Sequence, residues 1–260
     1  MAPLAAGGAA RGHLMSGQSA AVRERPEAPA RTLVVLQPAY LPWLGFFDQM
    51  RRSDVFVYYD DVQFDKHGWR NRNRIKSPGG PLWLSVPVLH HGRGQPRIID
   101  AEIDTRTAWA RKHVGTLRQF YSKAPYFKQY LPELEDMLNR PWTHIVDLDI
   151  GVAALLAKWL RVSPTVYRSS ELGIDGAQSE RLLNLCRHFG ATRYLSGSAA
   201  REYLDVDLFA RHDVDVVWQD YDHPVYPQQY GEFVPYLSGI DLVFNCGNDS
   251  ATILERGSVQ

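Results

Sequence analysis

The sequence is poor in cysteine, has no excess of charge of either sign and contains no long apolar run. Two cysteines, Cys186 and Cys246, occur in 260 residues, which disfavours a disulfide-stapled secreted domain and predicts a reducing compartment, the cytoplasm. Basic and acidic side chains number 29 each, so no overall field attracts DNA or an anionic membrane, and neither is expected as a partner. No stretch approaches the ~20 consecutive apolar residues of a membrane-spanning helix.

Several motifs that mark common chemistries are also missing. Neither GxGxxG nor GxxxxGK[ST] occurs, so the standard phosphate cradles are absent. The sequence also lacks GxSxG, the nucleophile elbow that would indicate a serine hydrolase. Neither CxxC nor HExxH is present, so no metal site is predicted and no cofactor is expected. Cys246 would act as a nucleophile only beside a base, for which His223 is the candidate.

Composition divides the chain into three parts. Residues 1–31 are rich in Ala, Gly, Arg and Pro, cannot bury enough apolar surface to offset the entropy of ordering, and are predicted to be a disordered extension. Residues 32–254 are predicted to form one α/β domain, and residues 255–260 a C-terminal tail.

Alternating strand and helix patterns predict an α/β fold with a Rossmann-like parallel sheet. Apolar runs at 33–37 and 55–59 flank a helical pattern at 43–52, which predicts a right-handed parallel strand pair. Further strands are expected at 162–168, 194–197 and 214–219, and helices at 107–121, 127–138, 142–160 and 179–189. Residues 69–103, with strands at 83–89 and 98–103, are predicted to form a small antiparallel insertion before the helical segment.

The first candidate site is the loop after the first strand, because ligands bind beyond the carboxyl ends of strands in open α/β sheets. Gln37, Tyr40 and Trp43 lie in this loop. The order of strand, loop and helix loosely resembles the element that carries the HIGH-type signature of class I aminoacyl-tRNA synthetases and nucleotidyl transferases. This loop lacks the histidines of that signature, and a proline-stiffened structural loop is the alternative.

Two carboxylates follow the second strand. Asp60 and Asp61 point in different directions from an extended chain, so one of them can face a site and act as a general base. Gln63 and Lys66 follow them as candidate substrate-binding residues. The structural alternative for the two carboxylates is a pair of caps or surface charges.

A basic, aromatic segment comes next. Trp69, Arg70, Asn71 and Arg72 are candidate binding residues, because arginine forks bind carboxylate or phosphate. Strand alternation predicts that Arg70, Arg72, Arg74 and Lys76 share one face. An anionic partner is expected for this segment, although the neutral chain disfavours nucleic acid.

The remaining candidates come from the C-terminal half. Ser196 and Gly197 form a turn whose backbone N–H groups can bind an oxyanion. His223 is a candidate general base by residue type, with a turn cap as the alternative. Asp241 lies in an apolar segment, 237–244, where a lone carboxylate needs a partner. Further candidate substrate-binding residues in this half are Tyr226, Gln228 and Asn245.

Together these motifs resemble the WbqC-like family over Thr32 to Leu254. The motifs are Gln37-Pro38-x-Tyr40-x-Pro42-Trp43-x-Gly45, Asp60-Asp61-Val62-Gln63-Phe64, Trp69-x-Asn71-Arg72-Asn73-x-Ile75-Lys76, Tyr194-Leu195-Ser196-Gly197, His223-Pro224-x-Tyr226-x-Gln228 and Leu237-Ser238-x-x-Asp241-Leu242-x-x-Asn245-x-Gly247. The family often has a histidine before the Gln-Pro pair, where this chain has Leu36.

The resemblance implies a cytoplasmic biosynthetic enzyme of polysaccharide or natural-product pathways. It implies a transferase that moves an acyl or aminoacyl group onto an amine of a small molecule, with a carrier protein, a carrier tRNA or a sugar nucleotide delivering the substrate. A nucleotide-dependent ligase or nucleotidyl transferase, and a non-catalytic binding module for a carrier or sugar intermediate, are the alternatives. The site is expected between residues 60–76 and the turn at Ser196, closed by residues 223–245.

Overall fold

A computed structural model describes residues 30–65, 68–89 and 96–258. The expected disordered extension therefore lies outside the described residues, except for its last two. Arg31 is fixed: its guanidinium donates to the Phe189 carbonyl (2.7 Å) and its own carbonyl accepts from Thr192 and Arg193. Among the helices so described, none combines the length and the apolar character needed to cross a membrane.

The centre of the fold is a parallel sheet in the order β5-β2-β1-β6-β7. β1 pairs in register with β2 on one side (Leu33 beside Val55) and with β6 on the other (Leu33 beside Tyr194). The strands are β1 (Thr32–Leu36), β2 (Val55–Tyr58), β5 (Thr165–Arg168), β6 (Arg193–Ser196) and β7 (Asp215–Trp218). The predicted Rossmann-like parallel core is confirmed.

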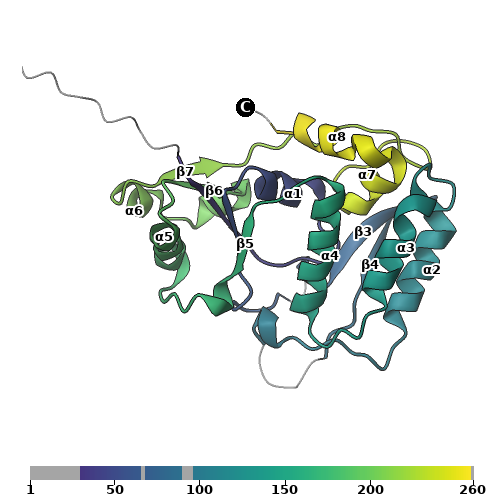
Figure 1. The fold of residues 1–260 in the computed structure, drawn as a ribbon, viewed down its shortest axis with the longest axis horizontal. Coiled ribbons are helices and arrows are strands. Elements are labelled where there is room, and N and C mark those ends of the chain that lie inside the picture. Colours follow the sequence, from purple (N-terminus) through teal and green to yellow (C-terminus); the bar gives the residue numbers. More distant parts are fainter. Residues whose placement is uncertain (1–29, 66–67, 90–95, 259–260) are drawn as a thin grey trace, which may run out of the picture.

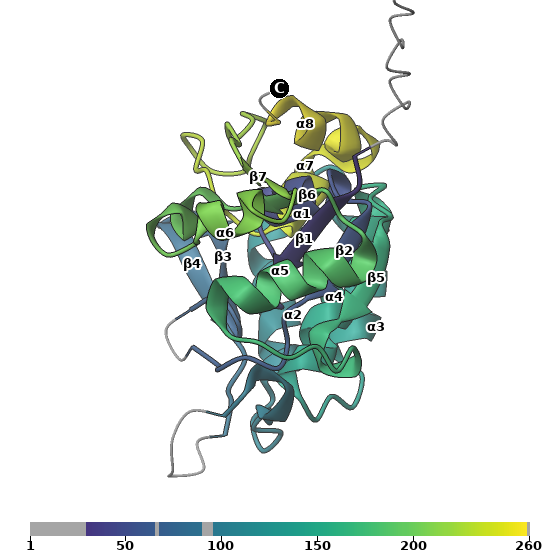
Figure 2. The same cartoon turned by 90° about the vertical axis from the view of Figure 1, so that its left-hand side faces the viewer.

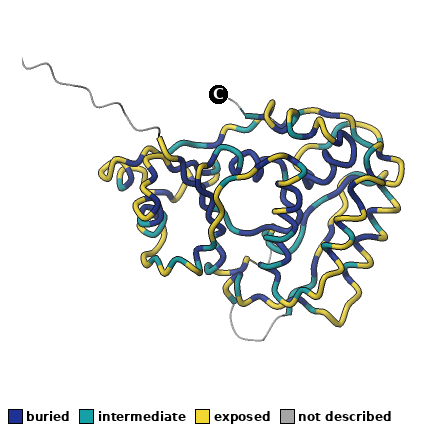
Figure 3. The backbone as a smooth tube through the Cα atoms, viewed as in Figure 1, coloured by how far each residue is buried: buried dark blue, intermediate teal, exposed yellow. Residues whose placement is uncertain are grey.

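Helices cover both faces of this sheet (Figures 1 and 2), and the central strands β1 and β2 are buried between them (Figure 3). Side chains alternate along the strands, so Val34 packs toward α1 (Leu44–Arg51) and α4 (Ile145–Trp159), whereas Leu33 and Val35 pack toward α5 (Gln178–Phe189) and α6 (Val206–Ala210). α5 ends at Gly190, whose positive φ of 61° suits glycine at a helix C-terminus.

The helical segment and the C-terminus complete the face that carries α1. These elements are α2 (Trp109–Tyr121), α3 (Phe127–Leu138), α7 (Gly239–Cys246) and α8 (Ser250–Arg256). The 3-10 helices are η1 (Ile98–Asp100), η2 (Ser169–Glu171), η3 (Ser198–Glu202) and η4 (Gly247–Asp249). The chain stays ordered beyond 254, because Ser258 Oγ accepts from Arg51 (2.7 Å) and donates to Asp48.

The antiparallel insertion is present, with different bounds from those predicted. It is a hairpin of β3 (Arg72–Ser77) and β4 (Gly80–Ser85). The strand predicted at 83–89 instead begins at Gly80 and ends at Ser85. The strand predicted at 98–103 is wrong: buried Ile98 begins η1, and only an isolated bridge joins Val88 to Ile103.

The predicted face of four basic residues is only partly right. Arg72 and Arg74 share the outer face of β3, but Arg70 precedes the strand. Lys76 is 2% exposed, because the loop after Gln228 covers it. Its Nζ donates to Gln228 Oε1 (3.0 Å).

A buried polar cluster joins this hairpin to α7. Asp241, fully buried, accepts hydrogen bonds from the hydroxyls of Tyr121 (2.6 Å) and Tyr226 (2.9 Å) and from Gln228 Nε2 (2.9 Å). Burial raises the pKa of Asp241, and these donors oppose the shift. The partners that this buried carboxylate needs are therefore groups of the protein itself. Tyr226 and Gln228, which the sequence suggested as substrate-binding residues, stabilise the fold.

We expect Tyr226→Phe to lower the free energy of unfolding by about 2 kcal/mol, because it removes a donor from a buried carboxylate. Urea unfolding at pH 7 measures the change, with Tyr167→Phe on the exposed surface of β5 as the control. An equal effect of the two substitutions would contradict the structural role of Tyr226.

Stability should also fall in mild acid because His113 is buried. Its Nδ1 lies 2.9 Å from the Tyr40 hydroxyl, and burial lowers its pKa to about 4. The unfolded chain gains a proton near pH 6.5 and the folded chain does not, so stability present above pH 6.5 is lost as the pH falls toward 4. The expected loss is on the order of 3 kcal/mol. Urea unfolding at pH 7 and pH 4.5 tests this, and His113→Gln should show a shallower pH dependence; equal slopes would refute it.

Candidate functional site

A pocket of about 570 Å³ lies at the carboxyl ends of β1 and β6. The connections that leave these neighbouring strands run to opposite faces of the sheet, which makes this the switch point where open α/β sheets bind ligands. Its lining comes from the loop after β1, from α1, from the turn after β6 and from the first turn of α5.

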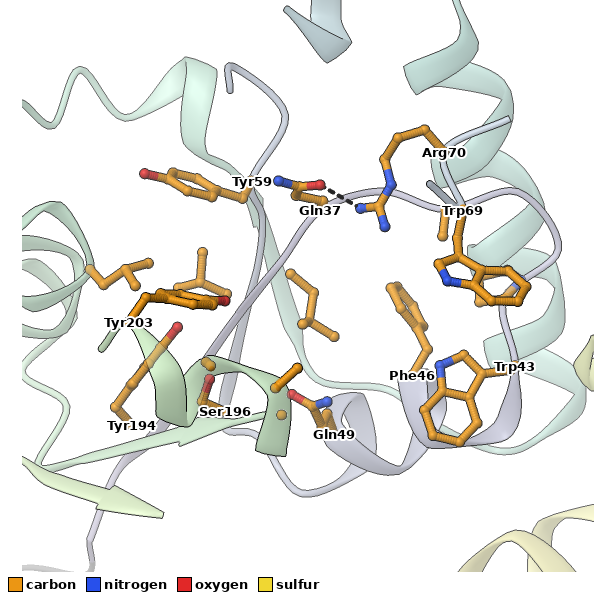
Figure 4. Close-up of a pocket in the computed structure, with 18 of the residues that line it drawn as sticks. Gln37, Trp43, Phe46, Gln49, Tyr59, Trp69, Arg70, Tyr194, Ser196 and Tyr203 are labelled. Atoms are coloured by element: carbon orange, nitrogen blue, oxygen red, sulfur yellow. Dashed lines mark hydrogen bonds between the residues drawn. The ribbon is translucent and has the colours of Figure 1, made fainter. Parts of the chain in front are cut away.

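Aromatic side chains form both ends of the pocket (Figure 4). Tyr59, Tyr194 and Tyr203 lie at one end, and Trp43 and Trp69 at the other. Large aromatic rings offer apolar contact area with few rotatable bonds, so the pocket suits a ligand with a flat or apolar portion.

Arg70 places a cation in the wall. Its Nη1 donates to Gln37 Oε1 (2.8 Å), which holds the guanidinium at the pocket. Burial lowers the pKa of Arg70, while the charges of Asp149 and Asp65 oppose that shift. Asp149, on α4, is fully buried and, among the described residues, neither of its oxygens has a hydrogen-bond partner. Burial raises the pKa of Asp149 well above its usual value, and Arg70 opposes this.

Gln49 lies in the wall on the opposite side of the pocket (Figure 4). Its orientation is fixed by Gln219, whose Nε2 donates to the Gly45 carbonyl and to Asp48 (both 2.8 Å). Gln219 Oε1 therefore faces Gln49 and accepts from Gln49 Nε2 (2.7 Å). Gln49 Oε1 is left buried, with no hydrogen-bond partner among the described residues.

Asp60 is an anchor of the sheet. It is fully buried and accepts from Arg168 Nε (2.8 Å), the Ser170 amide (2.9 Å) and the Ser170 hydroxyl (2.8 Å). These bonds join the end of β2 to the end of β5. Asp60 does not line the pocket, and the expected base is not found there.

Asp61 is tied to α5. Its carboxylate accepts from Arg181 Nη1 (3.1 Å) and Nη2 (2.5 Å) and from the Ser169 hydroxyl (2.6 Å). Burial alone raises the pKa of Asp61, but the bonds from Arg181 and Ser169 hold it below its usual range. Arg181 lies 5.1 Å from the ring centre of Tyr59, so Asp61 braces the pocket wall through Arg181.

His223 also lies outside the pocket lining. Its ring packs among Tyr221, Tyr226, Phe233 and Tyr236. Burial lowers its pKa, and Nε2 has no hydrogen-bond partner among the described residues. The imidazole is a member of an aromatic cluster.

Of the sequence candidates, the structure brings six to the pocket: Gln37, Trp43, Trp69, Arg70, Ser196 and Gly197. Tyr40 is core, and Gln63 is exposed beside Arg97. Asn71 donates to the Val86 carbonyl (2.7 Å), and Asn245 to the Asp241 carbonyl (2.7 Å). Arg72 lies over the Trp83 ring. Lys66 lies outside the described residues.

Sequence reasoning named Asn73, Tyr194 and Tyr203 within its motifs and clusters but missed other lining residues: Phe46, Gln49, Tyr59, Gln178 and Ser179. Gln49 was missed because it lies in a helix that the sequence analysis recognised only by its apolar residues. Tyr59 directly precedes Asp60, so its position after β2 was the available clue.

The profile of the WbqC-like protein family matches residues 37–253. The chain belongs to the WbqC-like family. It is similar to the uncharacterized protein Rv1507c of Mycobacterium tuberculosis, with 36% identity over 226 residues, which are 86% of this chain and 97% of that protein. No solved structure matches the chain.

The substitution Asp61→Asn should show whether Asp61 holds Arg181 in place or acts as a general base. Loss of the Arg181 pair is expected to lower the free energy of unfolding by about 1–3 kcal/mol. Activity below the unfolding temperature should then fall far less than the 10²–10⁴-fold that loss of a general base costs. Chemical denaturation and initial rates measure the two effects.

The matched control is Arg181→Gln, which breaks the same pair from the other side. Similar losses of stability in both variants, and no further loss in the double variant, support bracing. A rate loss of about 10³ confined to Asp61→Asn would restore the base hypothesis.

Proposed function

We propose that this protein is a cytoplasmic biosynthetic transferase that moves an acyl or aminoacyl group onto an amine of a small molecule, and that the reaction takes place in the pocket between β1 and β6. The observation that carries the proposal is the placement of two groups across one pocket: Gln49 Oε1, an acceptor with no partner among the described residues, and Arg70, a cationic donor.

These two groups fit the two halves of an amide-forming reaction. An amine N–H can donate to Gln49 Oε1, which orients the nitrogen lone pair toward the donor carbonyl. Arg70 can hold the oxygen on which negative charge develops, or a carboxylate or phosphate of the donor. The aromatic ends of the pocket exclude water that would otherwise hydrolyse the activated donor.

The chemical step needs no further reagent. The amine nitrogen bonds to the carbonyl carbon of a thioester or ester, and the bond to sulfur or oxygen then breaks. The leaving thiolate or alkoxide takes the proton that the attacking nitrogen loses. Among the described residues that line the pocket there is no carboxylate or imidazole, so the protein positions the reactants and the leaving group accepts the proton.

The same lining favours a second candidate, a non-catalytic binding module for a carrier or sugar intermediate. A binding protein needs the arginine, the acceptor and the aromatic rings, but no group that moves a proton. Product formation separates the two functions.

The nucleotide-dependent ligase hypothesis gains less support from the first loop. Tyr40 and Leu41 are fully buried, and Asn73 Nδ2 donates to both of their carbonyls (3.2 and 2.7 Å). The Tyr40 amide donates to the Trp69 carbonyl (3.2 Å). These bonds commit the loop to packing against the hairpin.

The test is amide formation by the purified full chain. Acyl thioesters and aminoacyl esters are offered with an amino-sugar nucleotide as acceptor, and mass spectrometry follows the mass of the acceptor. We expect an acylated product, and Arg70→Gln should lower kcat/KM about 100-fold because a charged contact to the reacting group is lost.

Arg140→Gln, which removes an exposed ion pair with Asp136 just beyond the end of α3, is the control and should keep full activity. Arg70→Lys keeps the charge without the fork and should give an intermediate rate. Saturable acceptor binding with no product from any donor would refute the transferase and favour the binding module.

A further inference from the structure

The outer face of the β3–β4 hairpin carries an aromatic and basic surface beside the pocket. Strand alternation turns Asn73, Ile75 and Leu84 toward the core, and Arg74 and Trp83, a cross-strand pair, outward. Figure 2 shows the hairpin at the periphery of the molecule. We call Trp69, Arg72, Arg74 and Trp83 the hairpin surface.

These side chains are stacked on one another. The rings of Trp69 and Trp83 lie 5.2 Å apart, with an angle of 35° between their planes. The guanidinium carbon of Arg72 lies 4.6 Å from the centre of the Trp83 ring, and that of Arg74 lies 5.5 Å from Trp69. Trp69 and Trp83 nevertheless remain 41% and 43% exposed, so indole surface is left for a further planar group.

The charge of the hairpin surface is of one sign. From Gly68 to Leu89 the sequence contains Arg70, Arg72, Arg74 and Lys76, and no aspartate or glutamate. Arg74 Nη2 donates to the Tyr236 carbonyl (3.2 Å), and Arg72 Nε to the Gly68 carbonyl (3.3 Å). A carbonyl partner leaves the charge of the Arg74 guanidinium in place, so an anionic group is favoured beside Arg74.

Trp69 belongs to both places. It stacks within the hairpin surface and also lines the pocket, where it faces the same end as Trp43 (Figure 4). A ligand that covers the hairpin surface can therefore extend past Trp69 to Arg70 without leaving the protein.

We propose that the hairpin surface binds the nucleotide portion of a nucleotide-linked substrate whose reactive end enters the pocket. The base stacks on the exposed indoles, since every base offers a π-face to an aromatic side chain. The phosphates lie against Arg74. This inference rests on the proposed function and names its substrate class. A nucleoside diphosphate and the end of an RNA strand share this chemistry.

Isothermal titration of the full chain, without acyl donor, tests the inference. The probes are UDP, ADP, uridine, pyrophosphate and a short single-stranded RNA. UDP or ADP is expected to bind with a Kd below about 1 mM, and uridine and pyrophosphate about tenfold more weakly. RNA that binds more tightly than either diphosphate identifies a nucleic acid carrier; RNA that binds no more tightly identifies a free nucleotide.

Variants locate the binding. Trp83→Leu and Arg74→Gln should each weaken nucleotide binding about tenfold, whereas Trp83→Tyr should retain it. Tyr167→Leu and Arg140→Gln, exposed residues of other elements, are the controls and should bind as the wild type does. Thermal unfolding of every variant shows that the fold is kept.

The inference is overturned if no nucleotide binds below about 1 mM, if pyrophosphate binds as tightly as UDP, or if Trp83→Leu and Arg74→Gln bind like the wild type. The hairpin stack then serves only to stabilise two strands. Amide formation without nucleotide binding would refute this inference and leave the proposed function standing. If the wild type binds nucleotide, these variants do not, and no amide forms, the proposed function is refuted and this inference stands.

Discussion

Strand β1 has a neighbour on each side, and the connections to the two neighbours leave on opposite faces of the sheet. Right-handed crossovers permit no other arrangement for this strand order. The loops after β1 and β6 therefore diverge, and the space between them cannot be filled by either connection. The position of the pocket follows from this constraint.

Three carboxylates that the sequence offered for chemistry instead stabilise the fold. Asp60 and Asp61 hold β5 and α5 at the end of β2, and Asp241 holds the hairpin against α7. Such carboxylates contribute to a unique arrangement because each would be costly to bury alone. Among the described residues that line the pocket, Arg70 is then the charged one, and we therefore propose that it has the largest part in recognising a ligand.

Local patterns predicted the fold well and the site only in part. Apolar periodicity gave α3 with its observed bounds, 127–138, and the order of strands and helices gave the parallel core. The partners of Asp60 and Asp61 could not be predicted, because Arg168 and Arg181 lie 108 and 120 residues further along the chain. Gln49 was missed since the face of a helix that borders a cavity looks, in sequence, like any buried face. Ile98 was misassigned because burial alone does not separate a strand from a 3-10 turn.

The hydrogen bonds that orient Gln49 do not stop at Gln219. Asp48 accepts from Gln219 through one carboxylate oxygen and from the Ser258 hydroxyl through the other. Hydrogen bonds between side chains thus connect Ser258, near the end of the described chain, to Gln49 in the pocket wall. A fluorophore or an isotopic label placed near Ser258 would report occupancy of the pocket without entering it. A bulky fusion joined there would disturb the same hydrogen bonds.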